Sequence, residues 1–245
     1  MDRVLYIAMS GAKQIMDAQA VNTNNLANAN TVGFKADLSA FQSRPVTGPV
    51  YASRVYAQSE SNGVDLRSGA MQSTGRALDV AIQGEGYIAV QAPDGSEAYT
   101  RAGNFELGAG GQLTTSSGHP VLGNGGVIAV PPYEKLDVGG DGTITIRPVG
   151  QSPATLATLD RIKLVKIPPD QLQKGTDGLL HRKEGGVAEA DASVRVVGGA
   201  LEGSNVSAVD SLVNMISLSR HFEMTLKAIT AAEENDREAS SILNL

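Results

Sequence analysis

The chain has 245 residues, which is long enough for one large domain or for a domain with substantial extensions, and 41% of the residues are hydrophobic. Its net charge of −6 and its lack of a long basic run argue against a nucleic-acid partner held by phosphate contacts. Because the chain contains no cysteine, disulfides, thiolate catalysis and cysteine-based zinc sites are excluded.

The N-terminal residues predict a helix from about Asp2 to about Asn28. Residues that could form one face recur at steps of three and four, apolar at first and amide-rich later: Val4, Leu5, Ala8, Ala12, Ile15, Gln19, Asn22 and Leu26. We expect Gly33 to follow the helix in a backbone conformation that other residues resist. Polar residues interrupt this segment too early for a signal peptide, and no stretch approaches the roughly 20 apolar residues that cross a bilayer. We therefore expect neither a cleaved signal nor membrane insertion.

Asparagine is unusually frequent at the end of this predicted helix. Five asparagines fall between residues 22 and 30, although asparagine is a poor helix former. Amides in a packed layer can bond to neighbouring elements and fix their register. Since these side chains point in several directions around the helix, the pattern predicts a helix that has several neighbours.

The middle of the chain predicts β-structure. Residues 78–90 indicate two short strands joined by Gly84-Glu85-Gly86, and the 28 glycines and 10 prolines of the chain indicate many turns. Hairpin turn signals follow: Asp94-Gly95, Asn124-Gly125, Asp141-Gly142 and Asp177-Gly178. We expect a β-rich outer domain over residues 75–203. The preceding residues, 36–74, are mostly polar or small, and predict a linker that is extended or poorly ordered in the isolated protein.

A second long helix is predicted within residues 204–245. Ser207 and Asp210 form a variant of the capping box. The apolar positions that follow keep the three-four spacing of a coiled-coil seam: Leu212, Met215, Ile216, Phe222, Leu226 and Ile229. Two long helices with apolar seams are not stable alone in water, so they must pack on each other, on the β-domain or on other subunits. The fold class is therefore α+β. The long N-terminal helix, within residues 1–35, and the long C-terminal helix are expected to pair in a coiled-coil-like core, and the central mainly-β domain lies between them in the chain.

Motifs for catalysis or metal binding are missing from the sequence. The three histidines are far apart, and neither G-x-S-x-G nor H-E-x-x-H occurs. Gly84-Glu85-Gly86 precedes a predicted strand rather than a helix, so we interpret it as a turn and not as a phosphate loop. Residues 139–142 lack the alternating acids of a calcium loop. We expect no catalytic residue, no cofactor and no metal, and thus no enzyme.

Four separated segments resemble the motifs of the bacterial flagellar rod and hook proteins. TNNLANANTVGFK at 23–35 resembles S-N-N-L-A-N-x-x-T-x-G-F-K, and LDVAIQGEGY at 78–87 resembles D-V-A-I-x-G-x-G-F, with threonine and tyrosine as the substitutions. YTRAGNF at 99–105 resembles Y-T-R-x-G-x-F. LEGSNV at 201–206, which leads into LVNMI at 212–216, is similar to the final element of the family. The resemblance covers almost the whole chain in the same order.

The resemblance implies a structural subunit of the flagellar basal body. In such proteins the terminal helices form a tube core and the β-domain forms its outer layer. The implied partners are copies of this chain, other proximal-rod and distal-rod subunits, and in transit the flagellar type III export apparatus, which needs no cleaved signal. The rod spans the periplasm and passes torque. The opening residues MDRVLYIAMSGA and the short connection after Lys35 favour the proximal rod over the distal rod.

Together, the resemblance and the helical seam predict the residues of the assembly interface. They are Asn24, Asn25, Leu26, Ala27, Asn28, Gly33, Phe34, Leu212, Met215, Ile216, Phe222, Leu226 and Ile229. Gly33 and Phe34 would turn the chain out of the core and anchor it. The competing interpretation is an autonomous β-domain that binds a ligand in a pocket of convergent polar groups, with both helices packed on their own monomer.

Overall fold

The computed structural model describes residues 3–45, 55–150 and 156–243, which divide into two units. Unit 1 contains residues 1–29, 36–65 and 206–245, and unit 2 contains residues 30–35 and 66–205. Each unit is therefore built from segments that are far apart in the sequence. The fold is α+β, as predicted, with an N-terminal helix, a mainly-β middle and a C-terminal helix.

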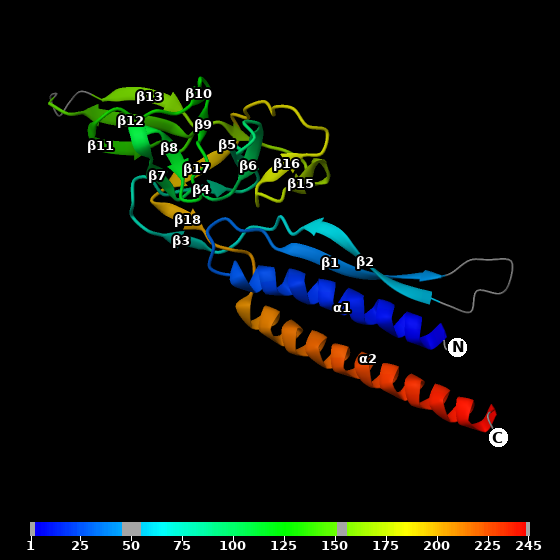
Figure 1. The fold of residues 1–245 in the computed structure, drawn as a ribbon. Coiled ribbons are helices and arrows are strands. Elements are labelled where there is room, and N and C mark those ends of the chain that lie inside the picture. Colours follow the sequence, from blue (N-terminus) through cyan, green and yellow to red (C-terminus); the bar gives the residue numbers. More distant parts are fainter. Residues whose placement is uncertain (1–2, 46–54, 151–155, 244–245) are drawn as a thin grey trace. The chain divides into compact units, whose positions relative to one another are not determined.

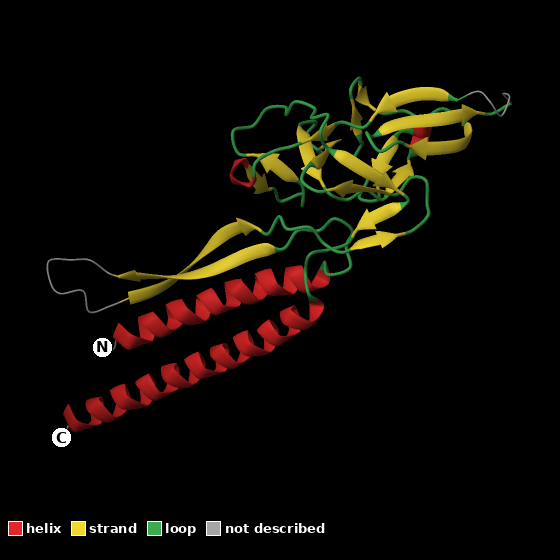
Figure 2. Cartoon of the chain, turned by 180° about the vertical axis from the view of Figure 1, so that it is seen from behind, coloured by secondary structure: helices red, strands yellow, loops and turns green. Residues whose placement is uncertain are grey.

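Unit 1 consists of two helices and a β-hairpin. Helix α1 spans Arg3–Ala27 and helix α2 spans Ala208–Leu243. Strands β1 (Asp37–Pro45) and β2 (Val55–Val64) pair in antiparallel register. Helix α1 packs against α2 and against both strands, so it lies between the hairpin and α2 (Figures 1 and 2). Both termini lie at the same end of the helix pair, which is thus antiparallel (Figure 1).

The chain after Ala36, expected to be extended or poorly ordered, forms a paired hairpin in this structure. Pairing runs from Asp37 opposite Val64 to Pro45 opposite Val55, and the Asp65 N–H donates to the Ala36 carbonyl at 2.8 Å. Polar composition suggested disorder because it offers little apolar surface to bury. The sequence pattern did not show that α1 would supply a surface on which these strands pack.

Unit 2 is built from short antiparallel strands. They are β3 (Met71–Ser73), β4 (Val80–Gln83), β5 (Tyr87–Gln91), β6 (Glu97–Thr100), β7 (Phe105–Leu107), β8 (Leu113–Thr115), β9 (Leu122–Gly123), β10 (Gly126–Val127), β11 (Tyr133–Val138), β12 (Thr143–Pro148), β13 (Ala157–Arg161), β14 (Leu164–Val165), β15 (Leu172–Lys174), β16 (Leu180–Arg182), β17 (Arg195–Gly198) and β18 (Ala200–Glu202). The largest sheet has the order β14-β5-β6-β16-β15, and a second has the order β11-β12-β13. The remaining strands form the pairs β17-β4, β18-β3, β7-β8 and β10-β9.

Each of the four predicted turn signals joins two paired strands. Asp94-Gly95 joins β5 to β6, Asn124-Gly125 joins β9 to β10, Asp141-Gly142 joins β11 to β12, and Asp177-Gly178 joins β15 to β16. The strands on either side of Gly84-Glu85-Gly86 are also present. They pair with different partners, however: β4 pairs with β17, while β5 pairs with β6 and β14.

The core of unit 2 is mainly aliphatic, with the buried rings of Tyr87, Tyr99 and Phe105. Tyr99 and Phe105 are among its largest fully buried side chains. Strands β4 and β5 are buried along almost their full length, which explains why their sequence is a continuous apolar run rather than an alternation. No described helix is both long and apolar enough to cross a membrane.

Candidate assembly site

Gly33 sits at a position of unit 2 that only glycine can occupy. Its φ is +68°, in the left-handed region that residues with a side chain avoid. A Cβ at this position would collide with the backbone of Arg101 and Ala102. The Gly33 N–H donates to the Glu202 carbonyl at 2.8 Å. The turn at Gly33, within the motif at residues 23–35, therefore contacts the backbone of unit 2 directly.

Two residues beyond Gly33, Lys35 begins a buried ionic network. Its side chain is 4% exposed, and its Nζ lies 2.6 Å from Glu202 Oε1. The same ammonium donates to the Arg67 carbonyl at 2.8 Å. On the other side of the carboxylate, Arg101 Nη1 lies 2.8 Å from Glu202 Oε2, and Arg101 Nη2 donates to the Gly84 carbonyl at 2.7 Å. We call Lys35, Arg101 and Glu202 the Glu202 clasp.

The electrostatics of the clasp keep Glu202 ionised. Burial alone would raise the pKa of its carboxyl group, but the hydrogen bond from Lys35, the charge of Arg101 and the N–H of Gly69 outweigh burial, so the pKa lies below its ordinary value. The Gly69 N–H donates to Oε1 at 2.9 Å. The Arg101 guanidinium also lies 5.3 Å from the centre of the Tyr87 ring. Burial raises the pKa of Tyr87, and the Arg101 charge opposes that rise.

The clasp brings together the four motifs that the sequence carries far apart. Lys35 comes from the first motif, Gly84 and Tyr87 from the second, Arg101 from the third and Glu202 from the fourth. The sequence did not assign a role to these charged residues. Charges within apolar and glycine-rich motifs were the available signal, because such residues are buried only when they are paired.

Phe34 is held within unit 2 beside the clasp. Lys174 Nζ lies 4.1 Å from the centre of the Phe34 ring and donates to the Lys35 carbonyl at 3.0 Å. The Phe34 carbonyl accepts a hydrogen bond from the Asn205 N–H at 3.3 Å. Half-buried Phe34 is thus anchored through its ring and through its backbone.

The asparagines of α1 contact two different neighbours within unit 1. The Asn25 amide makes two bonds to the backbone of Asp37, donating to its carbonyl and accepting from its N–H, both at 2.9 Å. Asn22 donates to the Ser211 carbonyl in α2 at 2.7 Å. The several neighbours expected from the amide-rich segment include segments of this same chain. Asn28 bonds back to the Asn24 carbonyl at 2.9 Å.

The remaining predicted residues of α1 differ in exposure. Asn24 and Ala27 are exposed, whereas Leu26 and Asn28 are half-buried. The helix therefore presents part of its amide-rich end to solvent while Asn22 and Asn25 bond inside unit 1.

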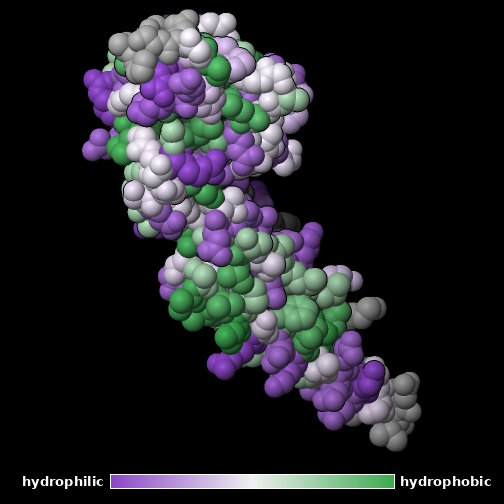
Figure 3. Space-filling view, turned by 90° about the vertical axis from the view of Figure 1, so that its left-hand side faces the viewer, coloured by the Kyte–Doolittle hydropathy of each residue, from purple (hydrophilic) through white to green (hydrophobic). Residues whose placement is uncertain are grey.

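The predicted seam of α2 divides into two groups. Met215, Phe222 and Ile229 are half-buried, and they share a helical spacing with buried Ser211 and Ala232. Exposed apolar side chains lie on other faces of the helix: Leu212 (49% exposed), Ile216 (56%), Leu226 (44%), Val209 and Val213. In Figure 3, hydrophobic surface gathers over part of unit 1 and gives way to hydrophilic surface toward one end. The helix itself begins as predicted, because the Asp210 N–H donates to Ser207 Oγ at 3.3 Å.

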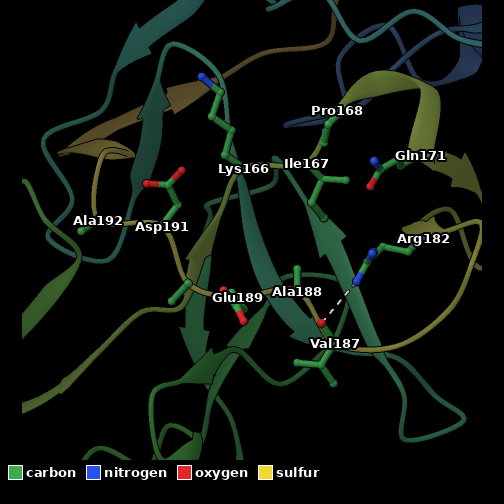
Figure 4. Close-up of a pocket in the computed structure, with 11 residues that line it drawn as sticks. Lys166, Ile167, Pro168, Gln171, Arg182, Val187, Ala188, Glu189, Asp191 and Ala192 are labelled. Carbon is green, nitrogen blue, oxygen red and sulfur yellow. Dashed lines mark hydrogen bonds between the residues drawn. The ribbon is translucent and has the colours of Figure 1, made fainter.

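An open pocket of unit 2, of about 570 Å³, does not gather polar groups around one point. Figure 4 shows Lys166 and Asp191 on one side of it and Gln171 and Arg182 on the other. Arg182 points toward the Val187 carbonyl and donates to it at 3.3 Å. The convergent site expected of a ligand-binding module is not formed in this pocket.

Three family models match the chain. The one described as flagella basal body rod protein matches residues 5–35, flagellar hook protein FlgE/F/G D1 domain matches residues 81–146, and flagellar basal body rod FlgEFG protein C-terminal matches residues 197–242. The chain is 43% identical to flagellar basal-body rod protein FlgF of Salmonella typhimurium over 251 residues, which cover 100% of both chains. The chain belongs to the flagellar rod and hook protein family. Within this family it is also 41% identical to FlgF of Escherichia coli, again over 100% of both chains.

A rod protein of another type is also similar to the chain. Flagellar basal-body rod protein FlgG of Bacillus subtilis is 35% identical over 258 residues, covering 95% of this chain and 96% of the relative. The greater identity to FlgF favours the FlgF type over the FlgG type. The chain is a structural subunit of the flagellar basal-body rod, and membership of the family implies that it assembles with other rod subunits. Its relatives carry the names of rod proteins rather than of enzymes.

Proposed function

We propose that this chain is a proximal-rod subunit whose terminal helices assemble with copies of itself and with neighbouring rod subunits. The resulting hollow shaft transmits torque from motor to hook. The proposal of the proximal rod is supported by the 43% and 41% full-length identity to FlgF of Salmonella typhimurium and of Escherichia coli, compared with 35% identity to the Bacillus FlgG. Its contribution is proposed to be mechanical, without catalysis.

The observation that carries this proposal is the apolar surface that α2 leaves exposed after it has paired with α1. Leu212, Ile216 and Leu226 are all more than two-fifths exposed. Burying one such side chain fully stabilises an interface by roughly 1.5–3 kcal/mol. We propose that these residues contact neighbouring subunits, together with the exposed Asn24 and Ala27 of α1.

The half-buried members of the predicted interface have a different role in this proposal. Met215, Phe222 and Ile229 hold α2 against α1 inside the subunit, while Asn25, Leu26 and Asn28 support the end of α1. Gly33 and Phe34 anchor the chain in unit 2. Assembly would thus depend on these residues through the shape of the subunit.

The proposal includes the place and route of assembly. The relatives are named as basal-body rod proteins, and we propose that this subunit lies in the periplasmic part of that structure. We propose that it reaches the periplasm through the flagellar type III apparatus, as its resemblance to the flagellar rod and hook proteins implies. The intact mass of the chain recovered from basal bodies tests this point, since signal cleavage would remove N-terminal residues.

The experiment that tests the interface compares Ile216→Glu with Asn214→Glu in cells that depend on this chain for motility. Both positions are exposed on α2, but only Ile216 offers apolar surface. We expect Ile216→Glu to abolish incorporation into basal bodies and motility, because it would bury an unpaired charge at the interface. Asn214→Glu is expected to assemble. Normal incorporation of Ile216→Glu, in a subunit whose helical content is unchanged, would contradict the proposal.

A further inference from the structure

The chain passes between the two units at four places, and residues near each passage belong to the Glu202 clasp or bond to it. The passages follow residues 29, 35, 65 and 205. The first two flank the segment that contains Gly33 and Lys35. The third is followed by Arg67 and Gly69, both of which bond to clasp residues, and the fourth comes three residues after Glu202.

These three segments of unit 2 are hydrogen-bonded to one another as well as to the clasp. The Arg67 carbonyl accepts from Lys35 Nζ at 2.8 Å and from Asn205 Nδ2 at 3.2 Å. The Gly203 N–H donates to the Ala70 carbonyl at 2.8 Å. The four passages therefore lead into three segments of unit 2, and each of these segments is bonded to the other two.

Glu202 makes further bonds to residues of the other two segments. Its carbonyl accepts from the Gly33 N–H, its Oε1 accepts from Lys35 and from the Gly69 N–H, and its Oε2 accepts from Arg101. We propose that Glu202 is a positioning residue for torque transmission: it locks together the three segments through which load from the terminal helices enters unit 2. This inference rests on the proposed function, because the load exists only in a rotating rod.

A buried ionic network is suited to such a role because it does not separate in small steps. Water does not reach Glu202, which is fully buried, so pulling one cation away leaves a charge uncompensated in a medium of low dielectric constant. Tension between the N-terminal and C-terminal segments acts directly across Gly33–Glu202 and Lys35–Glu202. Both contacts must open before either segment can leave.

The test is single-molecule pulling of the full chain between two different pairs of attachment points. We call the axis joining each pair a line. The native sequence has no cysteine, so introduced cysteines are the only attachment points. A terminal line joins Lys13→Cys to Lys227→Cys, both at exposed helical positions; once the helices have separated, its tension crosses the clasp. An internal line joins Ser117→Cys to Glu184→Cys, both exposed in unit 2, and its tension does not pass through the terminal segments.

The variant to compare with the native chain is Glu202→Gln. The lifetime of folded unit 2 at constant force is expected to fall about 100-fold along the terminal line, because removing one partner of a buried ion pair is strongly destabilising. Along the internal line we expect the lifetime to fall only about tenfold, since forced unfolding reports the barrier along the direction pulled. Equal falls along both lines would show that Glu202 only stabilises unit 2, and would overturn the inference.

Two further measurements keep the outcomes separate. If Glu202→Gln does not fold, Lys35→Met is pulled along the same lines with the same two outcomes, because its Glu202 keeps the partner Arg101. The exposed pair Lys135–Asp137, at 2.7 Å, provides the control Lys135→Met, which should change neither lifetime. Absence of the native chain from isolated basal bodies would overturn the proposed function, whereas equal falls would overturn only the role given to Glu202.

Discussion

The two units of this rod subunit differ in which side chains they bury. Unit 2 has an apolar core and also buries four charged residues, Lys35, Asp79, Arg101 and Glu202, each of which has an ionic partner. Unit 1 leaves apolar residues such as Leu212 and Ile216 exposed on a helix that is already packed on one side. This difference is consistent with the proposal that subunits contact one another through the helices of unit 1.

The largest effect is expected from breaking the clasp in unit 2. Glu202→Gln should lower the free energy of unfolding by about 3–5 kcal/mol, because Lys35 and Arg101 would remain buried without their carboxylate. Urea unfolding followed by tyrosine fluorescence measures the change, since the chain has no tryptophan. Lys135→Met, at an exposed ion pair, should stay within about 0.5 kcal/mol of the native chain. A loss no larger than that of this control would refute the buried network as a source of stability.

A smaller effect is expected from the helix pair of unit 1. Phe222→Ala should destabilise the packing of α2 by about 2 kcal/mol, less than the 3–5 kcal/mol of a fully buried phenylalanine, because Phe222 is only half-buried. We expect the variant to lose assembly into rods while unit 2 stays folded. Thermal unfolding followed by helical circular dichroism gives the first result, and basal-body isolation gives the second. Normal rods and normal motility with Phe222→Ala would contradict this prediction.

The contact between α1 and the hairpin should be weaker still. Asn25→Ala removes both hydrogen bonds to the Asp37 backbone and is expected to cost about 1–2 kcal/mol, because two hydrogen bonds at a half-buried position are lost. Hydrogen exchange at the Asp37 N–H should become faster. Asn24→Ala, at an exposed position of the same helix, is the matched control and should leave that exchange rate unchanged. Unchanged exchange in Asn25→Ala would exclude the contact.

The smallest effect is the pH dependence of the stability that Glu202 contributes to unit 2. Because the pKa of Glu202 lies below its ordinary value in the folded chain, the stability it contributes is present above that ordinary value and is lost as pH falls through the folded pKa. The difference in unfolding free energy between the native chain and Glu202→Gln should therefore be constant from pH 7 to about 5 and shrink below about 4.5. Urea unfolding between pH 7 and 3 measures it. A difference that grows on acidification would reverse the assigned sign.

The sequence determined the local elements of this protein, because helix periodicity and turn chemistry act over short stretches of chain. Helix α1 ends within one residue of its prediction, and the turns at Asp94-Gly95 and Asp141-Gly142 join paired strands. The motifs also gave the family. The predicted division of the chain into four segments, with boundaries after residues 35, 74 and 203, stays a prediction.

The tertiary structure alone decided which residues meet across long distances in the sequence. It folded the polar strands after Ala36 onto α1, and it divided the apolar positions of α2 into a half-buried face and an exposed one. It also joined Lys35, Arg101 and Glu202, which lie 66 to 167 positions apart, in one buried network. A seam pattern records that a residue is apolar but not which neighbour covers it. An ionic contact between distant residues has no periodic signature, because only the folded chain brings the charges together.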